Sequence, residues 1–358
     1  MRSEHLQDVR RVVVKLGTGI LTDSRKRPDQ VQFAQLVAQV AALRATGREV
    51  VMVSSGAVGA GMGVLGFETR PKDLADLQAC AAVGQSRLMA MYESLFRHYE
   101  QGVAQVLLTY EDLADHNRHL NARNTLLTLL KRGVVPIINE NDAVSVTELK
   151  FGDNDRLSAL VASLLPADLL VILTTAEGLI ENYGRADARR VAVVEELTEA
   201  VANEAGGTTS ATAVGGMKTK IDAARIVLRS GIPLVIASGR RFDALARILS
   251  GADEGTLFLP GKSRLTARKR WIAFYHRPAG TLVVDDGASR ALCDNGRSLL
   301  APGIARVDGD FEAGSVVRIC DGAGRELARG ISRRSSSELG TKKSAPGEVV
   351  HRDDLVVL

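Results

Sequence analysis

The stretch PIINENDAVSVTELKFGDNDRLSA, residues 136–159, runs from an apolar segment through two polar clusters into a helical pattern. The first cluster, Asn139–Asp142, directly follows the apolar run Val134–Ile138, and the second, Asp153–Asp155, stands where the helical pattern begins. A single Asn or Asp is enough for one turn. Seven acids and amides in two clusters therefore predict a polar site at the end of a buried strand.

The same alternation of short apolar runs and helical patterns extends over the first 260 residues. Buried apolar strands separated by amphipathic helices predict crossover units, and hence a mainly parallel sheet with helices on both faces. Ligands of such sheets bind at the carboxyl ends of the strands. The expected strands are Arg11–Leu16, Glu49–Val53, Ala104–Leu108, Val134–Ile138, Leu169–Leu173 and Leu234–Ile236. The expected helices are Val31–Ala45, Leu74–Tyr99, Ala122–Lys131, Arg156–Leu165 and Lys220–Arg229.

The pattern changes near the end of the chain. From Gly280 onward, short strands and tight turns follow one another, with one short helical stretch at Ala288–Asn295. We therefore expect an α/β domain over residues 1–260, a basic connector over residues 261–279, and a small, mostly β, barrel-like domain over residues 280–358.

Composition limits the class of protein. The apolar fraction of 45% and the charged fraction of 25% are those of a globular protein. No run of eighteen apolar residues occurs, and the first fifteen residues lack the apolar core of a signal peptide, so no membrane span is expected. The three cysteines are widely spaced and form no CxxC pair. This pattern argues against a disulfide framework or a zinc site and favours a reducing, cytoplasmic location.

Charge is unevenly distributed along the chain. From Gly261 onward there are 17 Lys and Arg against 12 Asp and Glu, whereas the first 260 residues hold 29 against 30. A basic tail domain is thus joined to a nearly neutral larger part. Both a solvated surface and a nucleic-acid contact are consistent with this excess of positive charge.

Two strand or loop ends carry lysines in unusual places. Lys15 lies inside the apolar run VVVKLGTGIL, where burial requires a compensating anion unless the side chain reaches out to water at the strand end. The segment TSATAVGGMKTK, residues 209–220, leads into a helix whose first turn carries Lys218 and Lys220. Cations there oppose the helix macrodipole. An anion bound between the loop amides and these lysines would make the arrangement favourable.

A third strand end, in VVMVSSGAVGAG at residues 50–61, presents hydroxyls and unhindered backbone N–H groups. Such groups can receive a carboxylate or a phosphate. The formal G-x-G-x-x-G at Gly61, Gly63 and Gly66 starts too far beyond the strand for a dinucleotide-binding turn, and no strand ending in Asp or Glu follows at the required distance. A dinucleotide site is therefore not expected.

Two further patterns have structural interpretations. Tyr92, Phe96 and Tyr99 follow helical spacing and are predicted to lie in the core. His116 and His119 have no carboxylate or cysteine partner at ligand spacing, so they predict a surface or interface position and no metal site.

Together, these parts match the needs of phosphoryl transfer. Lysines can neutralise the oxygens of the transferred group, and glycine-rich turns let the backbone approach it closely. The carboxylates would hold the lysine ammonium groups and bind a cationic group of the acceptor. A carboxylate acceptor, with a pKa of about 4, needs no general base at neutral pH.

The ordered motifs VVVKLG, VSSGAVGAG, INENDAV, FGDNDRLSA and GGMKTK closely resemble those of the amino-acid kinase family. The stretch Val307–Ile319 resembles the PUA domain. The resemblance implies the amino-acid kinase fold followed by a PUA-like domain. It also implies ATP-dependent phosphorylation of the side-chain carboxylate of L-glutamate, the first step of proline biosynthesis.

The resemblance also implies roles for individual residues. Lys15 and Lys220 would hold the transferred phosphoryl group, and Asp155 would keep both lysines in place. The residues implied for glutamate are Ser55, Asp142 and Asn154. Those implied for ATP are Lys15, Thr174, Thr175, Val214, Gly215, Gly216, Met217, Lys218, Thr219 and Lys220. Mg²⁺ would enter with the nucleotide phosphates, without protein ligands of its own.

Two positions depart from the family pattern. Thr175 stands where the family usually has Asp, and Lys218 adds a cation at a variable position. Three other functions stay open: an acetylglutamate kinase, which would have less use for Asp142 because its substrate has no free ammonium group, an aspartokinase, and an RNA-binding protein on a kinase scaffold. The resemblance further implies a homo-oligomer, proline as a feedback inhibitor, and a weak RNA contact through the tail domain.

Overall fold

The computed structural model describes residues 2–23, 28–145, 154–204, 216–261, 264–341 and 347–358. The chain folds as two compact units, Met1–Arg264 and Leu265–Leu358. No helix among the described residues is long and apolar enough to cross a membrane.

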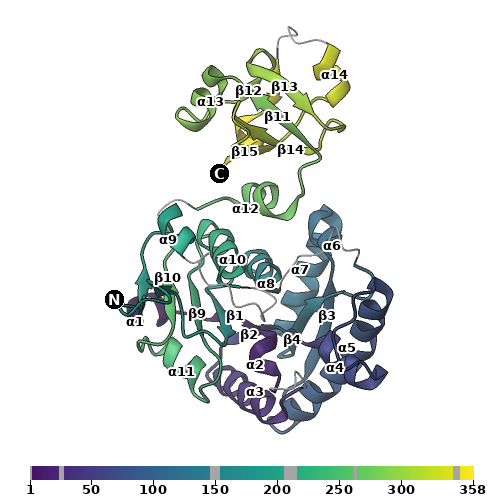
Figure 1. Cartoon of the computed structure of the whole chain (residues 1–358), viewed down its shortest axis with the longest axis vertical. Coiled ribbons are helices and arrows are strands. Elements are labelled where there is room, and N and C mark those ends of the chain that lie inside the picture. The colour runs from purple at the N-terminus through teal and green to yellow at the C-terminus, as the bar shows by residue number, and fades with distance from the viewer. Residues whose placement is uncertain (1, 24–27, 146–153, 205–215, 262–263, 342–346) are drawn as a thin grey trace. The chain divides into compact units, whose positions relative to one another are not determined.

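The first unit is built on an eight-stranded sheet with the order β3-β4-β2-β1-β5-β9-β10-β8 (Figure 1). All neighbouring strands run parallel except β9 and β10. The strands are β1 (Arg11–Leu16), β2 (Glu49–Val53), β3 (Val103–Leu108), β4 (Val135–Glu140), β5 (Leu169–Thr174), β8 (Val193–Val194), β9 (Leu234–Ser238) and β10 (Thr256–Phe258). A separate hairpin pairs β6 (Ile180–Glu181) with β7 (Arg189–Arg190).

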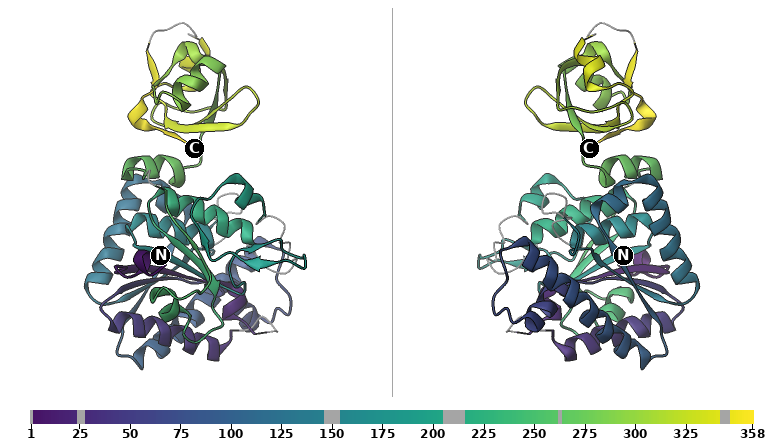
Figure 2. Two further views of the ribbon diagram at one scale, coloured as in Figure 1. Left: turned by 90° about the vertical axis from the view of Figure 1, so that its left-hand side faces the viewer. Right: turned by 90° about the vertical axis from the view of Figure 1, so that its right-hand side faces the viewer.

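Helices cover both faces of this sheet (Figures 1 and 2). Those with contacts to strands of the sheet are α2 (Thr18–Leu21), α3 (Gln30–Ala45), α5 (Leu74–Arg97), α7 (His116–Lys131), α8 (Asn154–Leu164), α10 (Met217–Arg229) and α11 (Ala244–Leu249). The other helices are α1 (Arg2–Leu6), α4 (Ala57–Leu65), α6 (Tyr110–Ala114) and α9 (Glu199–Glu204). In Figure 1, α8 and α10 lie on one side of the central strands and α3 and α11 on the other.

The alternation of side chains along β1 explains why it carries a lysine. Val12, Val14 and Leu16 belong to the core cluster that includes residues of α3, α5 and α11. Because successive side chains of a strand point to opposite faces, Lys15 points to the other face, where α8 packs against β1. The lysine thus lies on the α8 side of the sheet.

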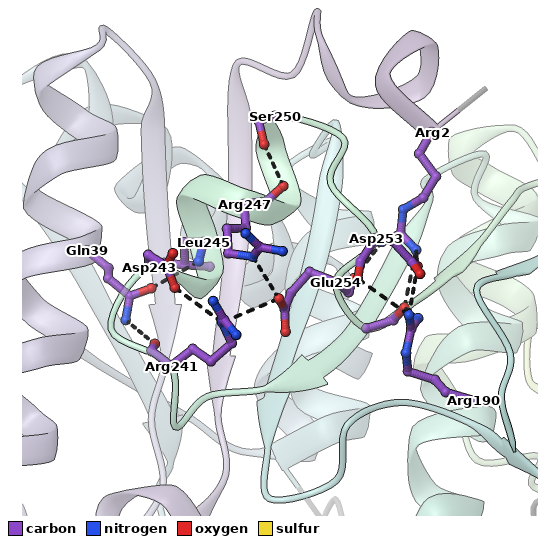
Figure 3. A network of polar contacts seen from close by, with 11 residues as sticks. Arg2, Gln39, Arg190, Arg241, Asp243, Leu245, Arg247, Ser250, Asp253 and Glu254 are labelled. Carbon is purple, nitrogen blue, oxygen red and sulfur yellow. Dashed lines mark hydrogen bonds and ion pairs between the residues drawn. The ribbon is translucent and has the colours of Figure 1, made fainter. Parts of the chain in front are cut away.

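A network of polar contacts surrounds the turn before β10, the strand that pairs antiparallel with β9 (Figure 3). Glu254, just before β10, accepts a hydrogen bond of 3.0 Å from Arg247 Nε and lies 3.5 Å from Arg241 Nε. Asp253 pairs with Arg190 at 2.7 Å and with Arg2 at 3.5 Å. These contacts connect the turn before β10 to α1, β7 and α11, where the chain reverses direction.

The strands and helices expected from the sequence are confirmed, with shifts of up to three residues at most ends, but α7 begins six residues before the expected Ala122, at His116. Thr174 and Ser238 extend β5 and β9 by one and two residues. The prediction that Tyr99 belongs to the core is wrong: α5 ends at Arg97, and Tyr99 is 45% exposed. Tyr92 and Phe96, inside the helix, are both fully buried, as predicted.

Two helices that follow the β2 end cross closely. A Cβ added to Gly61 of α4 would lie 1.9 Å from the carbonyl oxygen of Cys80, and one added to Gly84 of α5 would lie 1.7 Å from that of Ala57. Only glycine fits at such contacts. Gly61 and Gly63 lie inside α4 and Gly66 caps its carboxyl end, so these glycines do not form a turn between a strand and a helix.

The second unit is mostly β, as expected. Its five-stranded sheet has the order β13-β11-β14-β15-β17, and β12 pairs with β16. The strands are β11 (Gly280–Val284), β12 (Leu299–Leu300), β13 (Ile304–Asp308), β14 (Val316–Cys320), β15 (Glu326–Ile331), β16 (Glu348–Val350) and β17 (Leu355–Val357). The helices are α12 (Ala267–Arg270), a π-helix at Trp271–Tyr275, α13 (Asp286–Cys293), α14 (Ser336–Thr341), and 3₁₀ turns at Ala301–Gly303 and Arg352–Asp354.

The turn between β13 and β14 explains the spacing of the glycines and the phenylalanine in the stretch Val307–Ile319. Gly309 and Gly314 have φ values of +90° and +93°, which L side chains rarely adopt. Between them Phe311 is only 4% exposed and packs in the core of this unit. A Cβ on Gly280 would lie 2.4 Å from the Phe311 ring. The glycines shape the turn that inserts Phe311.

Candidate active site

The carboxylate of Asp155, in the first turn of α8, lies between two lysines from other elements. Lys15 Nζ of β1 lies 2.6 Å from Oδ1, and Lys220 Nζ of α10 lies 3.0 Å from Oδ2. Asp155 is fully buried, and Lys15 and Lys220 are 4% and 5% exposed. The sequence thus placed three residues of distant segments correctly at one strand-end face.

A hydroxyl supports the same carboxylate. Thr219 Oγ1 lies 2.8 Å from Asp155 Oδ2 and 2.9 Å from the carbonyl oxygen of Gly216, the residue before α10. Burial raises the pKa of Asp155, but the charges of Lys15 and Lys220, with the hydrogen bonds of Lys15 and Thr219, outweigh it and hold this pKa below its ordinary value. Asp155 is therefore a fixed anion between two fixed cations.

A second polar cluster lies at the ends of β2 and β4. The Nδ2 group of Asn154 lies 2.8 Å from the carbonyl oxygen of Ser54, 2.9 Å from Ser55 Oγ and 2.9 Å from Asn139 Oδ1. An amide nitrogen has only two hydrogens, so at least one of them is shared. Asn154 Oδ1 is buried and has no hydrogen-bond partner within the described part of the chain.

Residues of the first polar cluster differ in burial. Asn139 and Glu140 end β4 and are 4% and 7% exposed. Asp142 follows two residues after Glu140 and is half-buried. Asn141 N–H donates to the carbonyl oxygen of Leu108 at the end of β3. The cluster therefore begins inside the sheet and ends at its rim.

The predicted nucleotide residues are only partly described. Thr174 ends β5 and Thr175 follows it, exposed. In the first turn of α10, Met217 and Lys220 are buried whereas Lys218 is exposed. Val214 and Gly215 lie outside the described residues.

Asn139 and Ser54 were not among the site residues predicted from the sequence, and Thr219 was predicted only for the nucleotide site. Asn139 was noted only as a cluster member, yet its Oδ1 also accepts from Glu140 N–H at 2.9 Å. Ser54 contributes its backbone carbonyl, and Thr219 contacts the carboxylate as well as the loop. Backbone carbonyls and hydroxyls leave no spacing pattern, so only the amide of Asn139 could have been found from composition.

Comparison with known proteins identifies the family of this chain. The model of the amino acid kinase family matches residues 10–238, which contain both clusters, and the model of the PUA domain matches residues 280–352. The chain belongs to the amino acid kinase family. In this chain, the Lys15–Asp155–Lys220 group lies at the carboxyl-end face of the sheet, where α/β folds bind their ligands.

Curated relatives of this amino acid kinase cover its whole length. The protein named glutamate 5-kinase in Geobacter sulfurreducens is 47% identical over 373 aligned residues, which span 100% of both chains. The protein of the same name in Moorella thermoacetica is 46% identical and covers 99% of this chain and 97% of its own.

Solved structures support the fold. The carbamate kinase from Giardia lamblia bound to AMP-PNP superposes with a TM-score of 0.53 at 21% identity, over 71% of this chain and all of its own. The UMP kinase from Bacillus anthracis gives a TM-score of 0.50 at 16% identity, over 72% of this chain and 99% of its own. At these identities the likeness concerns the fold alone.

Proposed function

We infer that this chain transfers the terminal phosphoryl group of ATP to the side-chain carboxylate of L-glutamate. The product, L-glutamyl 5-phosphate, is the first intermediate of proline biosynthesis. The observation that carries this function is the 47% identity, over the full length of both chains, to a protein named glutamate 5-kinase. The two lysines held by one buried carboxylate are the matching chemical feature.

Lys15 and Lys220 neutralise the oxygens of the phosphoryl group during transfer. In the transition state of transfer, the phosphoryl group carries negative charge on its equatorial oxygens. Prepositioned cations stabilise this charge most in a site that excludes water. Asp155 holds both ammonium groups before the substrates arrive. Because these side chains are already fixed, little reorganisation remains for the reaction itself.

Ser55, Asn154 and Asp142 receive the amino acid. The amide of Asn154 is held by Ser54, Ser55 and Asn139 and lines the glutamate site beside the Ser55 hydroxyl. The carboxylate of Asp142, at the rim, pairs with the ammonium group. The Ser55 hydroxyl is held by Asn154 Nδ2 at 2.9 Å.

The nucleotide lies across the other half of the strand-end face. Thr174, Thr175 and residues 216–220 line its site, and the N–H groups at the start of α10 face its phosphates. The described residues contain no group of three or more metal-ligating side chains, and both oxygens of Asp155 contact lysines. We propose that Mg²⁺ enters with the nucleotide phosphates, whose charge it would shield.

No general base is needed for this acceptor. A side-chain carboxylate with a pKa of about 4 is already ionised at neutral pH. The protein's part is therefore to orient the two substrates and to neutralise charge, as expected for phosphoryl transfer.

Regulation and assembly follow the family resemblance. We propose that proline inhibits the enzyme, that the chain forms a homo-oligomer, and that the PUA domain makes a weak RNA contact. We place the enzyme in the cytoplasm, where all three of its free cysteines would stay reduced.

A hydroxylamine trap tests the function directly. Purified protein is mixed with ATP, Mg²⁺ and hydroxylamine, and offered L-glutamate, L-aspartate or N-acetylglutamate separately. An acyl phosphate reacts with hydroxylamine to give a hydroxamate, so the acceptor is identified by its own product. Hydroxamate with glutamate alone is the expected result. A signal with another acceptor would keep the fold and replace the substrate, and no signal with any acceptor would favour RNA binding on a kinase scaffold.

A further inference from the structure

A buried hydroxyl pair lies directly behind the residues proposed to bind glutamate. Ser54 Oγ and Tyr92 OH are 2.8 Å apart, and both residues are fully buried. Ser54 follows the last residue of β2, whereas Tyr92 lies in α5, five residues before the end of that helix. The contact therefore joins the end of a central strand to a helix of the covering layer.

The direction of these hydrogen bonds follows from what each group can donate. Ser54 Oγ also lies 3.3 Å from the carbonyl oxygen of Ser55. If Tyr92 donates to Ser54 and Ser54 donates to this carbonyl, both hydroxyl protons have acceptors. In the opposite direction the buried Tyr92 proton would lose its acceptor, which is costly. Burial raises the pKa of Tyr92, more than the hydrogen bond with Ser54 lowers it, so the phenol keeps its proton.

Ser54 is held from two sides. Its side chain contacts Tyr92, and its backbone carbonyl accepts from Asn154 Nδ2 at 2.8 Å. Its own N–H donates to the carbonyl oxygen of Ile138 in β4. The next residues are Ser55, whose hydroxyl contacts Asn154, and Gly56, whose φ of +100° turns the chain into α4. The orientation of Ser55 thus depends on how firmly Ser54 is held.

The tyrosine hydroxyl has no part in filling the core. The Tyr92 ring packs edge-on against Phe33 with ring centroids 5.2 Å apart, a contact that a phenylalanine ring would make equally well. Core packing alone thus explains an aromatic residue here but does not explain a hydroxyl. The hydrogen bond with Ser54 explains why this position carries a hydroxyl.

We propose that Tyr92 is a positioning residue for the amino-acid substrate: through Ser54 it fixes the turn that presents the Ser55 hydroxyl and the Asn154 amide. This inference rests on the proposed function, because it assumes that glutamate binds at Ser55 and Asn154. Tyr92 does not contact the substrate in this proposal. It acts through the hydroxyl of Ser54.

Steady-state kinetics of Tyr92→Phe test the proposal. The variant keeps the ring and loses only the hydroxyl, so we expect the KM for glutamate to rise about three- to tenfold, the effect of one hydrogen bond, with the KM for ATP unchanged. Ser163→Ala is the matched control. This substitution also breaks a buried contact between two hydroxyls, those of Ser163 and Ser230 at 3.0 Å. The contact lies at the other end of α8 from Asn154. Ser163→Ala should lower the melting temperature similarly without changing either KM.

A double-mutant cycle separates positioning from general weakening. Because Tyr92 and Ser54 act through one contact, Tyr92→Phe should change the glutamate KM little once Ser54→Ala is present. Equal rises in both KM values, or full additivity, would overturn the proposal, as would a glutamate KM that stays at the wild-type value. The wild-type enzyme is assayed first with glutamate. If it forms no hydroxamate, the proposed function fails, whereas normal wild-type activity with unchanged Tyr92→Phe kinetics refutes only the role of Tyr92.

Discussion

Lys15 Nζ lies 2.6 Å from Asp155 Oδ1, although one residue belongs to the first strand of the sheet and the other to a helix that follows the fourth strand. Two buried opposite charges stabilise each other only when their geometry is good, since each loses its hydration. Here a second lysine and Thr219 complete the set around the carboxylate. Such a group of charges is expected where a further anion, the transferred phosphoryl group, has to be received.

Replacing Lys220 should affect turnover far more than replacing its neighbour Lys218. Both lysines are in the first turn of α10, but only Lys220 is buried against Asp155, whereas Lys218 is exposed. We expect Lys220→Met to lower kcat by about a hundredfold or more, the usual cost of losing one prepositioned charge in the transition state. Lys218→Met should change kcat by less than about threefold, measured by coupled ADP release. Similar losses in both variants would contradict the assignment.

Stability should depend on pH through Asp155. Its pKa is lowered in the folded chain, so the stability it contributes is fully present above the ordinary carboxyl value of about 3.9 and is lost as the pH falls through the lowered value. Asp155→Asn should reduce the free energy of unfolding by about 3–5 kcal/mol at pH 7, because two buried lysines lose their anion.

Urea unfolding of wild type and Asp155→Asn between pH 7 and pH 3 measures this dependence. The difference in unfolding free energy between the two proteins should shrink toward the acid end. For Ser163→Ala, which removes no titrating group, the difference should stay constant. A difference for Asp155→Asn that does not change with pH would mean that Asp155 carries no net stabilising charge.

The sequence predicted the first unit well because its signals are local. Apolar runs such as Arg11–Leu16 and Glu49–Val53 coincide with β1 and β2, since a strand buried on both faces admits few polar residues. Lys15 stood out for the same reason. The polar clusters marked strand ends, and a parallel sheet brings such ends together. The pairing of Lys15 and Lys220 on one carboxylate is a consequence of this topology.

The features that could not be predicted from the sequence depend on contacts between distant segments. Ser54 and Tyr92 carry no spacing signal, because their pairing arises only when α5 packs beneath the end of β2. Tyr99 continued the helical spacing of Tyr92 but lies beyond the end of α5. The antiparallel strand β10 was also not expected, since it has only three residues and is placed by the network around Glu254.

Replacing Asp142 should weaken the binding of glutamate but not that of ATP. The residue stands half-buried beyond the end of β4, where its carboxylate would pair with the ammonium group of the amino acid. We expect Asp142→Asn to raise the KM for glutamate more than about tenfold, the effect of losing a charged hydrogen bond. The KM for ATP should stay within about twofold. Inhibition by glutarate, which has both carboxylates of glutamate and no ammonium group, provides the control. Its inhibition constant should be nearly the same in both proteins, and a parallel loss would place Asp142 elsewhere in the site.

Two glycines of α4 should respond to alanine in opposite ways. At Gly61 a Cβ would lie 1.9 Å from the carbonyl oxygen of Cys80, whereas at Gly63 it would meet nothing within 4 Å. Gly61→Ala must therefore separate α4 from α5, and we expect it to lower the free energy of unfolding by roughly 1–3 kcal/mol. Gly63→Ala should raise the free energy of unfolding by up to about 1 kcal/mol, because alanine restricts the unfolded chain and favours the helix.

The same two variants test whether the contact between α4 and α5 affects the glutamate site. α4 begins directly after Ser55 and Gly56, so a displacement of this helix moves the Ser55 hydroxyl away from Asn154. Gly61→Ala should then raise the KM for glutamate in addition to lowering the melting temperature, whereas Gly63→Ala should leave the KM unchanged. Thermal melting and glutamate saturation curves of both variants measure this. If Gly61→Ala lost stability while the glutamate KM stayed at the wild-type value, the position of Ser55 would be independent of the crossing and would depend on Ser54 and Asn154 alone.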